Sequence, residues 1–204
     1  MISFSYAMQY LNSIIQQQMR GFSVITFVEM SLFILTLLFL FMFVNSRIRK
    51  RGFAWKKFGK LFMLLCYICF MFQVAIYRRE PGSRHLISSD IDFGSLSGDF
   101  LSVQQVVYCL LNIAFFIPLG AFFMIQRWNQ DETGMIFREN IMVTLCCFLL
   151  SFSIECIQLA TSTGFFELTD IIVNTGGGFI GAFLASMLLQ MWQSRFHQRK
   201  DEMK

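Results

Sequence analysis

The stretch LFILTLLFLFMFV, from Leu32 to Val44, decides the fold class of this 204-residue chain. Every side chain in it apart from Thr36 is apolar, so the run has no polar face to present to water. A lipid-facing strand alternates apolar and polar residues, whereas a helix that crosses a bilayer is apolar on all sides. The run therefore predicts a transmembrane α-helix.

Four further runs of similar composition follow along the chain. The chain is 55% hydrophobic and only 15% charged, which is too apolar for a soluble domain of this length. A bilayer core about 30 Å thick needs about 20 apolar residues per helix. The sequence thus predicts an all-α integral membrane protein with one domain, a bundle of about five transmembrane helices. The predicted spans cover residues 22–44, 61–77, 105–125, 141–160 and 170–192.

Basic residues concentrate on one side of the predicted membrane. The connection 45–60 carries seven cations and no acidic residue, which is typical of a cytoplasmic loop. With this loop inside, thirteen of the 17 Lys and Arg residues lie inside, and residues 78–104 form an outer loop. The N-terminus is then expected outside and the C-terminus in the cytoplasm. We interpret the net charge of +4 as a topology signal and an attraction to anionic lipids, not as a nucleic-acid surface.

The first 20 residues are less apolar than the spans. Tyr10, Leu11, Ile14 and Ile15 fall near one helical face, with amide and hydroxyl residues elsewhere. This pattern predicts either a helix lying on the outer membrane interface or a disordered tail.

The residue types that hold metals are few or poorly placed. All six cysteines fall within predicted spans, where the spacing of Cys66 and Cys69 is more typical of packing than of a redox or metal site. The two histidines, His85 and His197, are far apart in the sequence. We therefore expect neither a metal nor a cofactor.

Polar side chains inside the predicted spans are the candidates for function, because they are costly in hydrocarbon unless they face protein, water or another polar group. Glu155 and Gln158 lie three residues apart, and Asp170 and Asn174 four apart, so each pair shares a helix face. Nine residues connect the two helices, which predicts antiparallel neighbours with these polar faces near the outer surface. Asn112 is expected at a similar depth in the third span.

Small residues continue the polar face of the fifth span. Gly177 and Gly181 are four residues apart, a spacing that predicts close packing between helices. A glycine-rich phosphate loop would follow a strand and end in a Lys or a dinucleotide-type helix start, both of which are missing. For Asp170, capping of the helix N-terminus is the alternative to a functional role.

Three blocks of sequence resemble the VanZ-like family. They are NIAFFIPLG (Asn112–Gly120), ECIQ (Glu155–Gln158) and DIIVNTGGGFIG (Asp170–Gly181), with Thr163 and Gly164 before the last. The resemblance implies a small multi-pass protein of the bacterial cell membrane. It also implies a relation to the founding member, which raises resistance to the glycopeptide antibiotic teicoplanin.

The chain departs from the family pattern near its acidic residues. The family usually has Arg after the Thr-Gly pair, where this chain has Phe165, and Glu167 stands where Asp is common. The outer loop also lacks the expected Asn-Leu-x-Pro-Phe run. Without that arginine, either another cation substitutes as the countercharge of Glu155 and Asp170, or the pKa values of these acids are raised. The candidates in the outer loop are Arg78, Arg79 and Arg84.

Three classes of function compete. The first is a non-enzymatic envelope protein whose outer-leaflet polar cavity binds a lipophilic or lipid-linked ligand, with teicoplanin resistance implied by the resemblance. The second is an intramembrane enzyme that acts on a lipid or cell-wall precursor with Glu155 and Asp170 as acid and base. No paired nucleophile supports it, so no catalytic residue is assigned. A transporter is disfavoured because no inverted repeat is evident. The predicted cavity residues are Asn112, Glu155, Gln158, Asp170 and Asn174.

Overall fold

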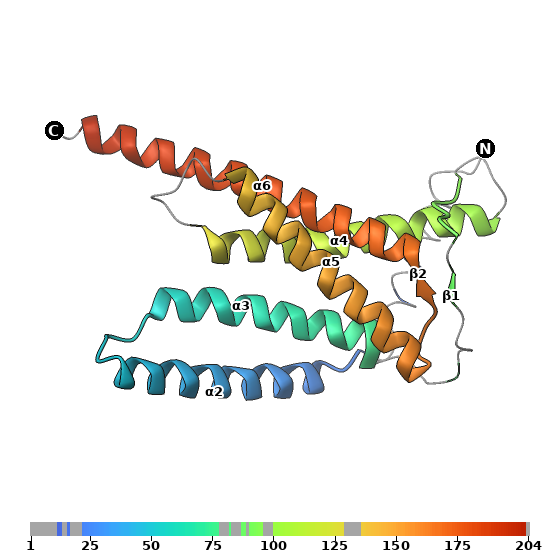
Figure 1. Cartoon of the computed structure of the whole chain (residues 1–204), viewed down its shortest axis with the longest axis horizontal. Coiled ribbons are helices and arrows are strands. Elements are labelled where there is room, and N and C mark those ends of the chain that lie inside the picture. The colour runs from blue at the N-terminus through green and yellow to red at the C-terminus, as the bar shows by residue number, and fades with distance from the viewer. Residues whose placement is uncertain are drawn as a thin grey trace.

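The computed structural model is a bundle of long helices with a very short sheet at one end (Figure 1). It describes residues 12, 13, 16, 22–77, 82, 87–88, 90–95, 100–128 and 136–202, with the backbone alone for 77, 100–102 and 196–202. Within these residues, five helices are long and apolar enough to cross a membrane. The predicted all-α membrane fold is therefore confirmed. The prediction for residues 1–20 lies outside the described residues except at Asn12, Ser13 and Gln16, which are helical.

The helices follow the apolar runs of the sequence and extend beyond most of them. Ser23 caps the first one, since its hydroxyl accepts a hydrogen bond from the backbone N–H of Thr26 at 3.2 Å. The helices are α2 (Val24–Ile48), α3 (Trp55–Phe72) with a π-helical turn (Gln73–Tyr77), α4 (Phe100–Arg127), α5 (Ile136–Thr161) and α6 (Leu168–Glu202). The strands are β1 (Ile87–Ser88) and β2 (Phe166–Glu167), which pair in parallel.

Lysines allow α3 to begin before its uncharged run. Lys56 and Lys57 are exposed in its first turn, where long stems can carry the ammonium groups to the headgroup level. Lys60 donates a hydrogen bond from Nζ to the backbone oxygen of Ile125 at 3.0 Å. Because carbonyls in the last turn of a helix lack intrahelical partners, this contact satisfies the end of α4 and joins it to α3.

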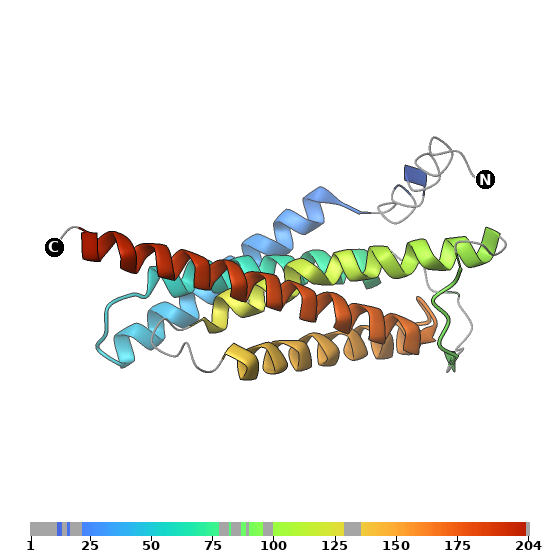
Figure 2. The same ribbon diagram turned by 90° about the horizontal axis from the view of Figure 1, so that it is seen from above.

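The helices α4, α5 and α6 pack together on one side of the bundle, and α3 and α2 lie on the other side (Figure 1; Figure 2 gives the view from above). Helix α6 packs most extensively on α4 and next on α5, while α3 packs on α4 and α2 on α3. The residue pairs in contact show that α4 and α6 run in the same direction, with α5 antiparallel to both. The core contains Met71, Phe116, Leu119, Val143 and Ala182, all at most 2% exposed.

Glycines bring the backbones of α4 and α6 into contact. A Cβ atom on Gly177 would overlap the carbonyl oxygen of Ile113, and one on Gly181 would overlap that of Ile117. Gly120 of α4 meets the backbone of α6 in the same way. The structure thus places Gly177 and Gly181 at a contact between two helices of the same chain. Only glycine allows the backbones of α4 and α6 to come this close.

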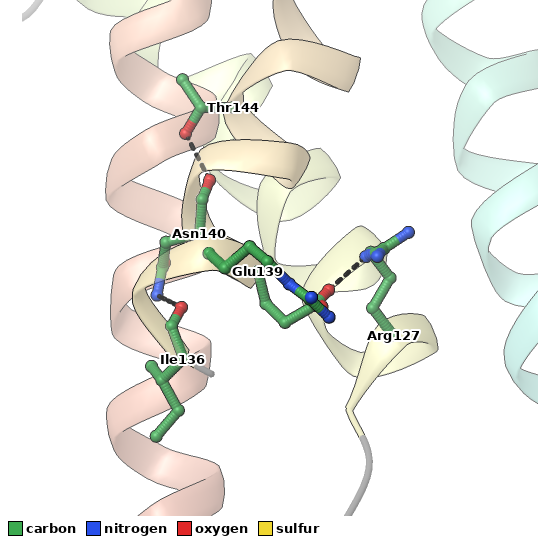
Figure 3. Close-up of polar contacts among 6 residues, drawn as sticks. Arg127, Ile136, Glu139, Asn140 and Thr144 are labelled. Carbon is green, nitrogen blue, oxygen red and sulfur yellow. Dashed lines mark hydrogen bonds and ion pairs between the residues drawn. The ribbon is translucent and has the colours of Figure 1, made fainter. Parts of the chain in front are cut away.

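The basic segments gather at one end of the bundle, opposite β1 and β2. The turn between α2 and α3, the end of α4 and the C-terminal part of α6 all lie there (Figure 1). Arg127 forms an ion pair with Glu139, which joins the end of α4 to the start of α5 (Figure 3). Beside it, Asn140 donates to the backbone oxygen of Ile136 and accepts at its own backbone oxygen from Thr144 (Figure 3).

Helix α2 is the least covered of the five. Leu38 is its one buried residue. Apolar side chains such as Ile25 and Phe41 are 72% and 69% exposed. Exposed apolar side chains are what a helix in lipid presents. Glu29 also lies on the exposed surface of α2.

Candidate functional site

The five predicted cavity residues are buried to different extents. Glu155 is 2% exposed, Gln158 4% and Asn174 6%, whereas Asn112 and Asp170 are half-buried. Glu155, Gln158 and Asn174 form hydrogen bonds with other elements near the end of the bundle that carries β1 and β2. Among the described residues, no hydrogen bond joins Asn112 to the other four. Glu155, Gln158 and Asn174 are therefore part of the interior.

A hydrogen bond between side chains joins α5 to α6. Asn174 donates from Nδ2 to the hydroxyl of Ser151 at 2.9 Å, and both residues are buried. The other amide atom of Asn174, Oδ1, has no hydrogen-bond partner within the described structure. An unpaired buried acceptor is costly, so this oxygen is a free position for a hydrogen-bond donor from a ligand or a water molecule.

Glu155 holds the connection that follows α5. Its Oε2 accepts a hydrogen bond from the backbone N–H of Glu167 at 3.1 Å. Glu167 belongs to β2, directly before the first residue of α6. A buried carboxylate therefore fixes the point at which the chain turns back into the bundle.

Gln158 forms its hydrogen bond with the segment that follows α3. Its Nε2 donates to the backbone oxygen of Ala75 at 3.0 Å, and Ala75 lies in the π-helical turn after α3. A π-helical turn breaks the regular hydrogen-bond pattern of an α-helix and is often found at functional sites. Gln158 thus joins α5 to α3, while Asn174 joins α5 to α6.

The segment before α4 folds over the start of α6. The hydroxyl of Thr169 accepts from the backbone N–H of Asp92 at 3.0 Å and donates to the backbone oxygen of Asp90 at 3.4 Å. Thr169 is 2% exposed. The side chain of Gln105 in α4 also donates to the backbone oxygen of Asp92, at 3.3 Å. Together with the pairing of β1 and β2, these bonds attach residues 90–95 to α4 and α6.

Four carboxyl groups of the described residues lie toward this end of the bundle. The carboxylates of Asp92, Glu167 and Asp170 lie close enough to the side chain of Cys109 to interact with it electrostatically. Glu155 reaches the same connection through its bond to Glu167. We call Asp92, Glu155, Glu167 and Asp170 the acidic end. Among the described residues, no group of three or more His, Cys, Asp and Glu side chains is arranged to hold a metal ion.

Some residues of this site were not singled out from the sequence. Ser151 lies four residues before Glu155 and therefore on the same face of α5, a spacing that could have identified it. Thr169 and Asp90 gave no such signal, because their contact joins residues 79 positions apart. The proposed countercharges Arg78, Arg79 and Arg84 lie outside the described residues.

We expect the bond between Ser151 and Asn174 to contribute measurably to stability. A double-mutant cycle with Ser151→Ala and Asn174→Ala should give a coupling of about 0.6 kcal/mol, the average for interhelical hydrogen bonds in membranes, and at most about 1.7 kcal/mol. The measurement is reversible unfolding in mixed micelles. Ser153→Ala is the matched control, since Ser153 is exposed on α5 and bonds to the backbone of its own helix. A coupling between Ser153 and Asn174 as large as that of Ser151 would contradict the assignment.

The fold and the site together define a class of protein, a multi-pass α-helical membrane protein with a polar interior at one end. A family model described as VanZ/LLP1 matches residues 33–190. The match covers most of the chain and includes α3, α4 and α5 entirely, so the chain belongs to the VanZ-like family. No curated protein and no solved structure gives a significant match.

Proposed function

We propose that this protein lies in the bacterial cell membrane and binds a lipophilic or lipid-linked ligand at its acidic end, thereby contributing to resistance against glycopeptides of the teicoplanin type. The orientation proposed is the one that places the basic end in the cytoplasm. Its support is the clustering of cations at the end of the bundle opposite β1 and β2 (Figure 1). The acidic end then faces the outer leaflet, where lipid-linked cell-wall precursors and the lipophilic tail of such an antibiotic are found.

One observation carries this proposal: Glu155 is a carboxyl group held 2% exposed inside a membrane bundle and bonded to the connection that closes its outer end. Burying an acidic residue at this depth is costly, and a simple packing position on α5 would be better served by an apolar residue. One acceptor near the same end, the Oδ1 of Asn174, has no hydrogen-bond partner among the described residues. Such an acceptor suits a ligand with ammonium or sugar hydroxyl donors.

The test is the inhibitory concentration of teicoplanin, beside vancomycin, in a sensitive Gram-positive host that expresses the protein. Wild type is expected to protect selectively against teicoplanin. Glu155→Gln is expected to return sensitivity to that of the empty vector, because the amide keeps a hydrogen-bond acceptor for Glu167 but removes the carboxylate charge.

Glu139→Gln is the matched control for this test. It makes the same change on the same helix, but at the opposite end of the bundle, where Glu139 pairs with the 41% exposed Arg127. Exposed ion pairs contribute little to stability, so this variant should protect like wild type at equal membrane levels. If both variants lose protection, the proposed role of the acidic end is excluded. It is also excluded if the wild type and the variants all fail to protect.

A further inference from the structure

A groove on the lateral surface of the bundle lies between α2, α3 and α4. Its volume is about 270 Å³, and it is lined by Phe27 of α2, Phe122 of α4 and five residues of α3 between Phe62 and Phe70. Five of the seven lining side chains are aromatic. The groove exists because α2 packs mainly on α3 and crosses it obliquely (Figure 2), which leaves space between α2 and α4.

The depth of the groove places it among the acyl chains of a bilayer. Counted along α3 from Trp55, Phe62 and Phe70 lie about 10 and 22 Å from the start of the helix at 1.5 Å per residue. The hydrocarbon core is about 30 Å thick. Lys56 and Lys57 mark the headgroup level near the start of α3, so the groove begins more than one helical turn below it. Polar headgroups do not reach this depth.

The chemistry of the lining excludes polar ligands. Tyr67 carries the one hydroxyl group in the lining, and it donates to the backbone oxygen of Phe115 at 2.7 Å. That hydroxyl is committed to α4 and leaves a lining of ring faces, thioether and thiol groups. Only an apolar molecule gains by entering such a site.

The shape of the groove suits a narrow occupant. It follows α3 from Phe62 to Phe70 and is flanked by one residue of α2, Phe27, and one of α4, Phe122. The volume is also below the roughly 300–1,000 Å³ of pockets that hold whole drug-sized ligands. A single flexible hydrocarbon chain fits both the volume and the direction of the groove, which follows α3 along the membrane normal.

We propose that this groove is a binding site for one acyl chain of a membrane lipid. The bound chain fills the space between α2 and α4 and packs against the rings of Phe27, Tyr67 and Phe122. In this way a lipid contributes the contacts that α2 lacks with the rest of the bundle. The site is separate from the acidic end and does not depend on the function proposed for it.

The experiment uses the full chain in phosphatidylcholine vesicles that contain a rising fraction of phosphatidylcholine with a diazirine in the middle of one acyl chain. After photolysis, the adducts are located by peptide mass spectrometry. Adducts on residues 62–70 of α3 are expected to level off as the probe fraction rises, because a site holds one chain. Adducts on the exposed face of α6, around Leu188, are expected to rise in proportion to the probe, as contact with bulk lipid does.

A variant then tests the groove directly. Cys66→Phe places a ring in the groove and is expected to remove the saturable adducts on α3, whereas Leu188→Phe, at a 66% exposed position, should leave them unchanged. Adducts on α3 that rise in simple proportion to the probe in wild type would overturn the proposal, even if Cys66→Phe failed to fold. Unchanged α3 adducts in a folded Cys66→Phe protein, or photoadducts that join two protein chains at the groove, would overturn it as well.

Discussion

Gly181→Ala is expected to destabilise the bundle by about 3 kcal/mol or more. The added Cβ would overlap the backbone oxygen of Ile117, and a helix backbone cannot move aside as a flexible side chain can. Overpacking typically costs 1–3 kcal/mol and sometimes more. Here the two helices must separate along their whole contact, so we place the effect at the upper end. Reversible unfolding in mixed micelles measures it, with expression level as a second readout.

Gly176→Ala is the control for this prediction. Gly176 lies on the same helix, but a Cβ there would meet nothing within 4 Å. Replacing a helical glycine by alanine at an open position is neutral or stabilises by up to about 1 kcal/mol. Equal effects at the two positions would show that the contact between α4 and α6 is looser than described.

Glu155→Leu is expected to open the connection between α5 and α6. The substitution removes the acceptor for the N–H of Glu167 and leaves that donor buried and unpaired. A hydrogen bond to a charged group contributes about 1.5–3 kcal/mol, which corresponds to an increase of about 10- to 100-fold in the hydrogen-exchange rate of the Glu167 amide. Exchange measured by mass spectrometry on a peptide covering residues 162–170 reports this opening.

Glu155→Gln separates the hydrogen bond from the charge. The amide oxygen of glutamine can still accept from Glu167, so exchange in this peptide should remain within a few-fold of wild type. If Glu155→Leu leaves exchange unchanged, the carboxylate does not hold the connection in solution. If both variants open it equally, the charge and not the hydrogen bond is responsible.

The membrane fold was predictable because its signal is carried by whole segments of sequence. Runs such as Leu32–Val44 are apolar on every side, and the glycine spacing at Gly177 and Gly181 indicates close packing before any partner is known. The identity of the partner was not predictable from the spacing. It required the direction and position of α4, which only the folded bundle supplies.

The polar site was predictable in composition and less so in its connections. The three-residue and four-residue spacings placed Glu155, Gln158 and Asn174 on inward faces, and all three are buried. Their partners are a backbone oxygen in a π-helical turn, a backbone N–H in a two-residue strand, and a serine. Strands of two residues have no detectable period, and a π-helical turn has no sequence pattern here, so these contacts arise from tertiary structure alone.

The parallel pairing of α4 and α6 also bears on the order of events during biosynthesis. Helix α6 supplies the principal partner of both α4 and α5, yet it leaves the ribosome after both of them. The glycine-bearing surface of α4 must therefore remain open to lipid or to a chaperone while α5 is inserted in the opposite direction. The packing of α4 against α6 is consequently a step that follows insertion. It brings together two helices that are not consecutive in the chain.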